Sequence, residues 1–193
     1  DIKRTIDGTL IGVTTKYFNA ANVDTNGIDI ELSYENNTNF GLLNVGLRGT
    51  HILEYEIPGS NGSAIDVVGL FNHDNFARSL PETKIVLNTS LSNNNHTVAL
   101  YGRYVSDYST TRPLSASAKD AGFDQKIDQW ITFDLQYSYS FNLLGNDIRL
   151  SIGGNNILDE DVPIVYDAAN FSYDPKHHDP RGRLFYFGLK LIR

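Results

Sequence analysis

The stretch WITFDLQYSYSF, residues 130–141, decides the fold class. Apolar and polar side chains alternate through it without a break. One set is Ile131, Phe133, Leu135, Tyr137, Tyr139 and Phe141, and the other is Trp130, Thr132, Asp134, Gln136, Ser138 and Ser140. Successive side chains of a β-strand point to opposite faces, so this period predicts a strand with one apolar and one polar face.

The same alternation recurs along the chain and predicts about eight strands and no convincing helix, although a short helical turn inside a loop stays possible. The other predicted strands cover residues 10–18, 28–35, 43–55, 85–91, 97–108, 148–153 and 185–191. Their connections alternate in length. Short polar turns are expected at 36–39, 92–95 and 142–146, and long segments at 56–82, 109–128 and 158–181.

This arrangement predicts an all-β, antiparallel up-and-down sheet with every short turn at one rim. Outer-membrane β-barrels have that asymmetry, with short periplasmic turns and long extracellular loops. Aromatic residues flank the short turns, as in the interfacial girdle of such barrels, although rings are also good strand formers. These residues are Tyr34, Phe40, Tyr139 and Phe141.

Composition limits the function classes. The 193 residues carry a net charge of −7 at a pI near 5.1, which argues against a nucleic-acid partner. Cysteine is absent, so disulfides and thiolate chemistry are excluded. No run approaches the roughly 18 apolar residues of a membrane helix. The mean hydropathy of −0.29 still suits a membrane β-barrel, because only every second side chain needs to face lipid.

The C-terminal third holds two distinctive motifs. The more specific one is Asn155-Asn156-Ile157-Leu158-Asp159-Glu160 followed by Pro163, and the other is Asp179-Pro180-Arg181-Gly182-Arg183, which introduces the final strand. With these motifs, the C-terminal third resembles the end of TonB-dependent outer-membrane receptors. Upstream, the segment from Asn22-Val23 to Gly27-Ile28-Asp29-Ile30 resembles a strand start of that family. The resemblance implies that residues 1–193 form the C-terminal part of the receptor barrel, about eight of some 22 strands, without the plug domain, the TonB box and the early strands. The ending Leu191-Ile192-Arg193 departs from the aromatic terminus usual in the family.

The resemblance also implies a function. A receptor of this kind lies in the Gram-negative outer membrane, with its loops extracellular and its C-terminus periplasmic. It binds a scarce nutrient, such as a siderophore or other iron chelate, a cobalamin or a carbohydrate, and imports it with energy from TonB, its partner through the plug region. Such transport breaks no bond, and no catalytic constellation is visible, so we expect no enzyme activity and no cofactor.

Candidate ligand contacts are Arg103 and Trp130, which are predicted on the polar face beside a long loop. A ring and a guanidinium there could stack on a sugar or pair with an anionic chelate. The alternative, which we favour, is a packing tryptophan and an arginine held by an acidic neighbour such as Asp134. The 158–181 segment carries a net charge of −4, with six acidic residues against Lys176 and Arg181, which disfavours a strongly anionic substrate.

Two clusters are interpreted as solvated rather than metal-binding. His177-His178, between Asp174 and Asp179, is expected in a solvated loop, and Asp159-Glu160-Asp161 is read as a solvated charge run. Two alternatives to a transport receptor stay open. One is a complete eight-stranded outer-membrane barrel with a structural or adhesive role. The other is a soluble β-barrel that carries a small ligand in an apolar interior.

Overall fold

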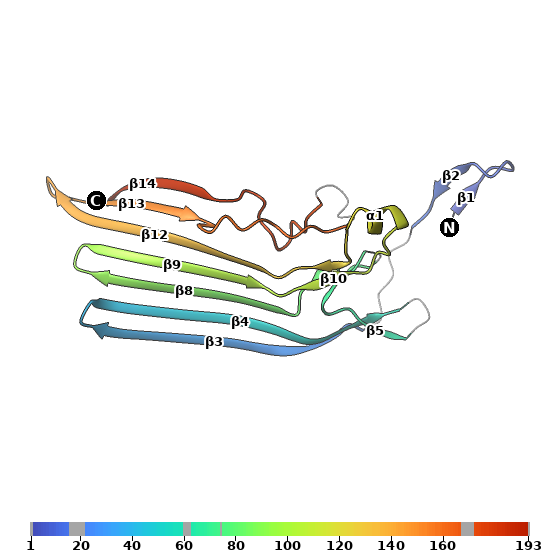
Figure 1. The fold of residues 1–193 in the computed structure, drawn as a ribbon. Helices are drawn as coiled ribbons and strands as arrows, with labels where there is room; N and C mark the ends of the chain where they lie inside the picture. Colours follow the sequence, from blue (N-terminus) through green and yellow to red (C-terminus); the bar gives the residue numbers. More distant parts are fainter. Residues whose placement is uncertain (1, 16–21, 60–62, 74, 167–171, 193) are drawn as a thin grey trace.

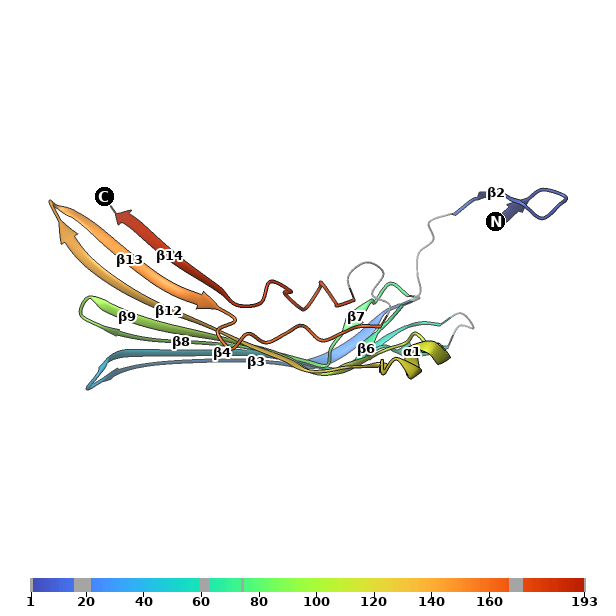
Figure 2. The same cartoon turned by 45° about the horizontal axis from the view of Figure 1, so that its top comes forward.

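The structure, a computed structural model, describes residues 2–15, 22–59, 63–73, 75–166 and 172–192. Its main element is a curved antiparallel sheet in which each long strand pairs with the next one along the chain (Figures 1 and 2). The long strands are β3 (Asp24–Thr38), β4 (Gly41–Pro58), β8 (Thr83–Asn93), β9 (His96–Val105), β12 (Trp130–Leu143), β13 (Asn146–Asn155) and β14 (Leu184–Ile192). The predicted up-and-down, all-β arrangement is therefore confirmed.

The first predicted strand, 10–18, is confirmed only at its start and does not join the main sheet. Only Leu10–Val13 (β2) is a strand there, and it pairs with β1 (Ile2–Arg4) in a separate two-stranded sheet; residues 16–18 lie outside the described chain. The eighth member of the main sheet is instead the short β5 (Ala64–Asp66), which pairs with β4. Alternation over so few residues does not specify which partner a strand chooses.

The short turns all lie at one end of the sheet and the long connections at the other (Figure 1). At the short turns the strands extend further than predicted and leave two-residue turns between β3 and β4, between β8 and β9, and between β12 and β13. In the last of these turns φ is 54° at Leu144 and 80° at Gly145. Positive φ at both central residues suits the twist of a tight hairpin, and glycine adopts it without strain.

The long connections fold into structure of their own. They contribute β6 (Leu70–Phe71), β7 (Ser79–Leu80), β10 (Tyr108–Thr110) and β11 (Lys126–Ile127), which form a second sheet in the order β11-β10-β6-β7. A five-residue helix, α1 (Ala116–Asp120), begins after Ser115, whose hydroxyl accepts a hydrogen bond from the Ala118 backbone. The two buried apolar clusters found in the described chain lie in this region, one around Ile57 and Val67 and one around Ile127 and Val165.

The two faces of the main sheet differ in exposure. On the apolar face, defined by Ile131, Phe133, Leu135, Tyr137, Tyr139 and Phe141 of β12, Leu135 is 41% exposed and lies between Leu100 of β9 and Gly154 of β13. Leu189 of β14, on the same face, is 68% exposed. On the polar face, defined by Trp130, Thr132, Asp134, Gln136 and Ser138, Thr132 is 2% exposed. Among the described residues, no buried apolar core covers the apolar face, unlike the sealed interior of a soluble carrier.

The sheet is open rather than closed. The outer edges of β3 and β14 pair with no other strand of the described chain. No helix in this part of the chain is long and apolar enough to cross a membrane.

Candidate functional site

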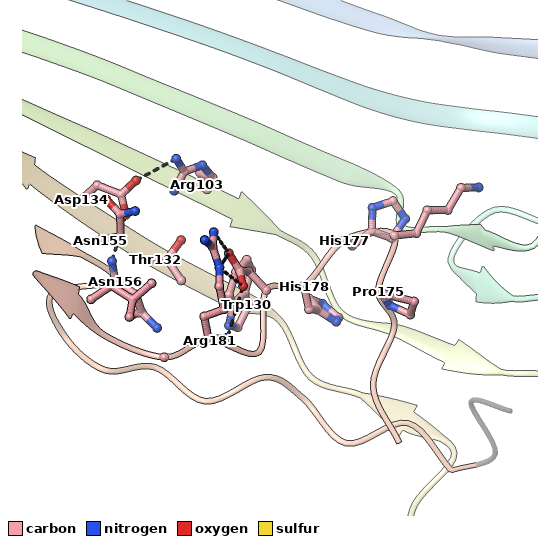
Figure 3. A pocket seen from close by; sticks show the side chains of 14 residues that line it. Arg103, Trp130, Thr132, Asp134, Asn155, Asn156, Pro175, His177, His178 and Arg181 are labelled. Atoms are coloured by element: carbon pink, nitrogen blue, oxygen red, sulfur yellow. Dashed lines mark hydrogen bonds and ion pairs between the residues drawn. The ribbon is translucent and has the colours of Figure 1, made fainter. Parts of the chain in front are cut away.

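The candidate site is a pocket of about 360 Å³ on the polar face of the sheet, near the end that carries the long connections (Figure 3). Its wall comes from strands β9, β12 and β13 and from the segment 175–184, which runs into β14. The strands contribute Arg103, Trp130, Thr132, Asp134 and Asn155, and the segment contributes His177, His178, Asp179 and Arg181 among others. Both predicted ligand contacts, Arg103 and Trp130, therefore line the same pocket.

Cross-strand register places the strand residues together. Arg103 of β9 pairs with Thr132 of β12, so the two side chains lie on the same face of the sheet. Trp130 and Asp134 lie two residues before and after Thr132 on β12 and therefore share that face. The Arg103 guanidinium approaches the Asp134 carboxylate to 2.7 Å (Figure 3). Asp134 also accepts a hydrogen bond of 2.9 Å from the Asn156 backbone. Arg103 is thus held by its acidic neighbour, as the favoured interpretation predicted.

The Trp130 ring packs against His178 and does not project into solvent. It is 5% exposed, and its ring meets the His178 ring nearly at right angles with the centroids 5.4 Å apart. The packing interpretation of Trp130 is consistent with this geometry. Its indole nitrogen has no hydrogen-bond partner among the described residues, although a buried N–H usually has one.

The sequence segment that resembles the receptor family forms a tight connection after β13. Asn156 has a left-handed backbone with φ of 47°, and its side-chain amide donates to the Glu160 carbonyl and accepts from the Glu160 N–H at 2.8 and 3.0 Å. Asparagine is one of the few residues other than glycine that tolerate this conformation. The Ile157 N–H donates to the Phe133 carbonyl of β12, so the connection stays against the sheet.

Asp159 ties this connection to the start of β14. Its carboxylate accepts from the Arg183 backbone at 2.9 Å and lies 3.3 Å from the Arg183 guanidinium. Residues 159–161 are exposed, as predicted for a solvated charge run, and Asp159 in addition contacts Arg183. In the described part of the chain, no group of three His, Asp or Glu side chains is arranged to hold a metal ion.

The segment 174–178 is anchored on a buried carboxylate. Asp174 is 2% exposed and accepts hydrogen bonds from the Tyr108 hydroxyl at 2.7 Å and from the Lys176 N–H at 3.0 Å. Burial, followed by the nearby Asp174 charge, raises the pKa of the Tyr108 phenol, so Tyr108 stays a donor. This pair fixes the turn that carries both histidines across the polar face.

The expectation of a solvated histidine pair is wrong for His178, which is 5% exposed. Burial lowers the pKa of His178 to about 4 and also lowers the pKa of His177. Both imidazoles are therefore neutral near pH 7. Neither ring nitrogen of His178 has a hydrogen-bond partner in the described chain.

Asp179 and Arg181 form a second charge pair in the pocket wall. The Arg181 Nε lies 2.9 Å from each carboxylate oxygen of Asp179, and the hydrogen bonds from Arg181 lower the pKa of Asp179. Gly182 follows with φ of 65°, as expected where the chain turns into the final strand. The turn predicted at 179–182 is confirmed, because residues 180–181 form a turn and Gly182 has a left-handed backbone.

The sequence did not predict Thr132 and His178 as site residues. Thr132 was placed on the polar face, but nothing in the alternation marks a threonine as part of a pocket. The position of His178 depends on how the 174–178 turn folds back, which no local pattern encodes. Comparison of the sequence with protein-family models and with curated proteins gave no match.

Proposed function

We propose that this chain forms part of the wall of an outer-membrane β-barrel that imports a scarce extracellular nutrient, in the manner of TonB-dependent receptors. The observation that carries the proposal is the exposure of the apolar face. The polar face is buried at some positions of β12 and exposed at others of the sheet, such as Arg48 of β4. Leu135, Ile152 and Leu189 are 41%, 59% and 68% exposed, whereas Thr132 and Ser138 are 2% and 5% exposed. In water such a sheet would expose a large apolar surface, whereas in a bilayer the same surface faces hydrocarbon.

The aromatic rings beside the short turns support the same orientation. Phe40 is 75% exposed in the turn between β3 and β4, and Tyr34 is 56% exposed near it. Tyr139 and Phe141 stack with their centroids 5.7 Å apart close to the turn between β12 and β13. Rings at this level suit the headgroup region, so the short turns would face the periplasm and the long, folded connections the exterior.

The outer edges of β3 and β14 pair with no other strand of the described residues, which is consistent with a larger barrel. A membrane-embedded edge with free N–H and C=O groups is costly, so in the proposed barrel each edge would pair with a further strand. In the proposed receptor these strands belong to the rest of the barrel, and a plug domain fills it and contacts TonB in the periplasm. The pocket at the long-connection end would then be reached from outside the cell.

The proposal is tested with the complete protein that contains this sequence, produced in a Gram-negative host. We expect it in the outer-membrane fraction, with heat-modifiable migration on gels and with residues such as Lys119 of α1 open to an impermeant amine reagent in intact cells. Recovery as a stable monomer in buffer without detergent would refute the proposal.

A further inference from the structure

We infer that His96, framed by Tyr137 and Tyr139, forms a binding site for the phosphate of a phospholipid headgroup at the short-turn border of the apolar face. This inference deepens the proposed function and rests on it, since only a sheet whose apolar face meets lipid brings these residues to a headgroup layer. It is carried by the place of His96 at the end of an uncharged band and by the free nitrogen of its ring.

Two histidines lie at opposite ends of the apolar face. His51 of β4 pairs with Thr83 at one end of β8, and His96 of β9 pairs with Asn93 at the other end. Positions 83 and 93 are an even number of residues apart, so both histidines lie on one face, and His96 pairs with Tyr139 of the apolar face. Between these two levels every apolar-face position of β8 is uncharged, and so is every facing position of β4, β9 and β12. The β8 positions are Ile85, Leu87, Thr89 and Leu91.

The length of this band matches the hydrocarbon layer of an outer membrane. β8 has 11 residues, so it covers ~33 Å from Thr83 to Asn93 at ~3.3 Å per residue. A strand tilt of ~40°, usual in outer-membrane barrels, reduces this length to ~25 Å along the membrane normal, and the apolar band of such barrels is ~25 Å tall. The two ends of the band therefore lie at the levels of the two headgroup layers, with His96 at the short-turn level.

The two tyrosines of β12 hold the His96 ring. Its Nδ1 lies 2.7 Å from the Tyr137 hydroxyl oxygen, and its centroid lies 4.9 Å from the centroid of the Tyr139 ring. The Nε2 atom has no hydrogen-bond partner among the described residues. His96 itself is exposed, in contrast to the buried His178, so a headgroup can reach the free nitrogen from the lipid side.

The Tyr137 hydroxyl suits an anion at the free nitrogen. When the hydroxyl donates to Nδ1 of the neutral ring, the ring proton lies on Nε2; when the ring is protonated, the hydroxyl accepts and Nε2 still carries a proton. An ionised phosphate oxygen only accepts, so it favours both arrangements, and it favours the second through charge as well. The cross-strand partners of His96 are Asn93 and Tyr139, so neither neighbouring strand places a carboxylate opposite the ring.

The test uses the complete protein in a non-ionic detergent and measures lipid retention by native mass spectrometry. Dimyristoyl phosphatidate and dimyristoylglycerol are the matched probes, because they share both acyl chains and differ only in the phosphate. We expect the protein to retain phosphatidate about tenfold better, as one charge-assisted hydrogen bond implies. Equal retention of the two lipids would overturn the inference.

Two histidine variants locate the site. His96→Phe keeps an aromatic ring beside Tyr139 and removes both nitrogens, so the preference for phosphatidate should fall to about twofold. His51→Phe is the matched control on the same face, because the His51 ring contacts the Thr83 hydroxyl at 2.8 Å in place of the two tyrosines; it should leave the preference near tenfold, roughly as in the unchanged protein. Heat-modifiable migration confirms that both variants fold. An unchanged preference in His96→Phe, or equal losses in the two variants, would refute the site.

Inorganic phosphate distinguishes a lipid from a soluble ligand. In excess it should leave phosphatidate bound, because the acyl chains also contact the apolar face, and displacement of the lipid would overturn the assignment to a headgroup. A protein that is inserted in the outer membrane but whose lipid preference does not depend on His96 refutes only the headgroup site. A protein that is a stable monomer in buffer without detergent refutes the proposed function, and the headgroup site with it.

Discussion

Replacement of Leu135 by arginine tests which face of the sheet meets lipid. Leu135 is 41% exposed, lies near the middle of β12, and belongs to an apolar row that includes Leu100 of β9 and Phe185 of β14. An arginine on the lipid face near the bilayer midplane costs ~2–4 kcal/mol of folding free energy. We therefore expect Leu135→Arg to lower the stability of the complete protein by that amount.

The neighbouring residue supplies a matched control. Gln136 lies on the polar face, where its side chain accepts a hydrogen bond of 2.9 Å from the Tyr186 hydroxyl. Gln136→Arg removes that bond, which costs about 1 kcal/mol, and places its cation in a polar environment. The two variants should thus differ by ~1–3 kcal/mol, although they introduce the same side chain one residue apart.

The measurement is reversible unfolding of the complete protein from phospholipid vesicles in urea, followed by tryptophan fluorescence and by gel migration without heating. Equal destabilisation by the two variants, or a larger loss for Gln136→Arg, would show that the assignment of the faces is wrong. Leu135→Ile gives the baseline for a change of shape without a charge and should cost less than about 1.5 kcal/mol.

The remaining predictions concern the 156–183 connection. His178 is neutral in the folded protein with a pKa of about 4, below its unfolded value of 6.5. Its contribution to stability is therefore complete above pH 6.5 and is lost as pH falls towards 4, by at most about 3 kcal/mol. Hydrogen exchange of 174–183 should accelerate over that range, and His178→Phe should remove most of the effect and leave the part that comes from His177, whose pKa is also lowered. Asn156→Ala removes two hydrogen bonds and replaces a residue that tolerates φ of 47°. We therefore expect the free energy of unfolding to fall by roughly 2–3 kcal/mol in the same urea assay. A change within experimental error would contradict the role of the Asn156 amide. Asp159→Asn removes the charge beside Arg183 but keeps an acceptor for the Arg183 N–H, so the free energy of unfolding should fall by only about 1 kcal/mol. Asp159→Leu removes both and should cost more. A larger loss for Asp159→Asn than for Asp159→Leu would refute the contact.

The long strands could be predicted because their periodicity is a local property. Nine paired positions align β12 with β13, and every apolar residue of 131–141 lies on the side that the alternation assigns to it. A slip of one residue would turn Leu135 to the polar face and Asp134 to the apolar one, so the sequence specifies the register strongly.

The folded connections could not be predicted in the same way. β6, β7 and β11 are two residues long each, too short for any period to appear. Their stability comes from contacts between distant segments, such as Tyr108 with Asp174 and Ile127 with Val165. The buried position of His178 follows from those contacts as well, which explains why a pair of histidines between aspartates was interpreted as solvated.

The chain segments that lie against the polar face bear on the size of the proposed barrel. A barrel of eight strands has an interior just wide enough to be filled by its own side chains. Here the polar face carries the long side chains of Arg48, Arg103 and Tyr186, and the chain segment 174–184 crosses the same face near β12 and leaves a pocket beneath it. A strand wall with a peptide segment and a pocket on its inner side needs a wider lumen. Under the proposed function, this geometry suits a wide barrel to which β3–β14 contribute part of the circumference better than it suits an eight-stranded one.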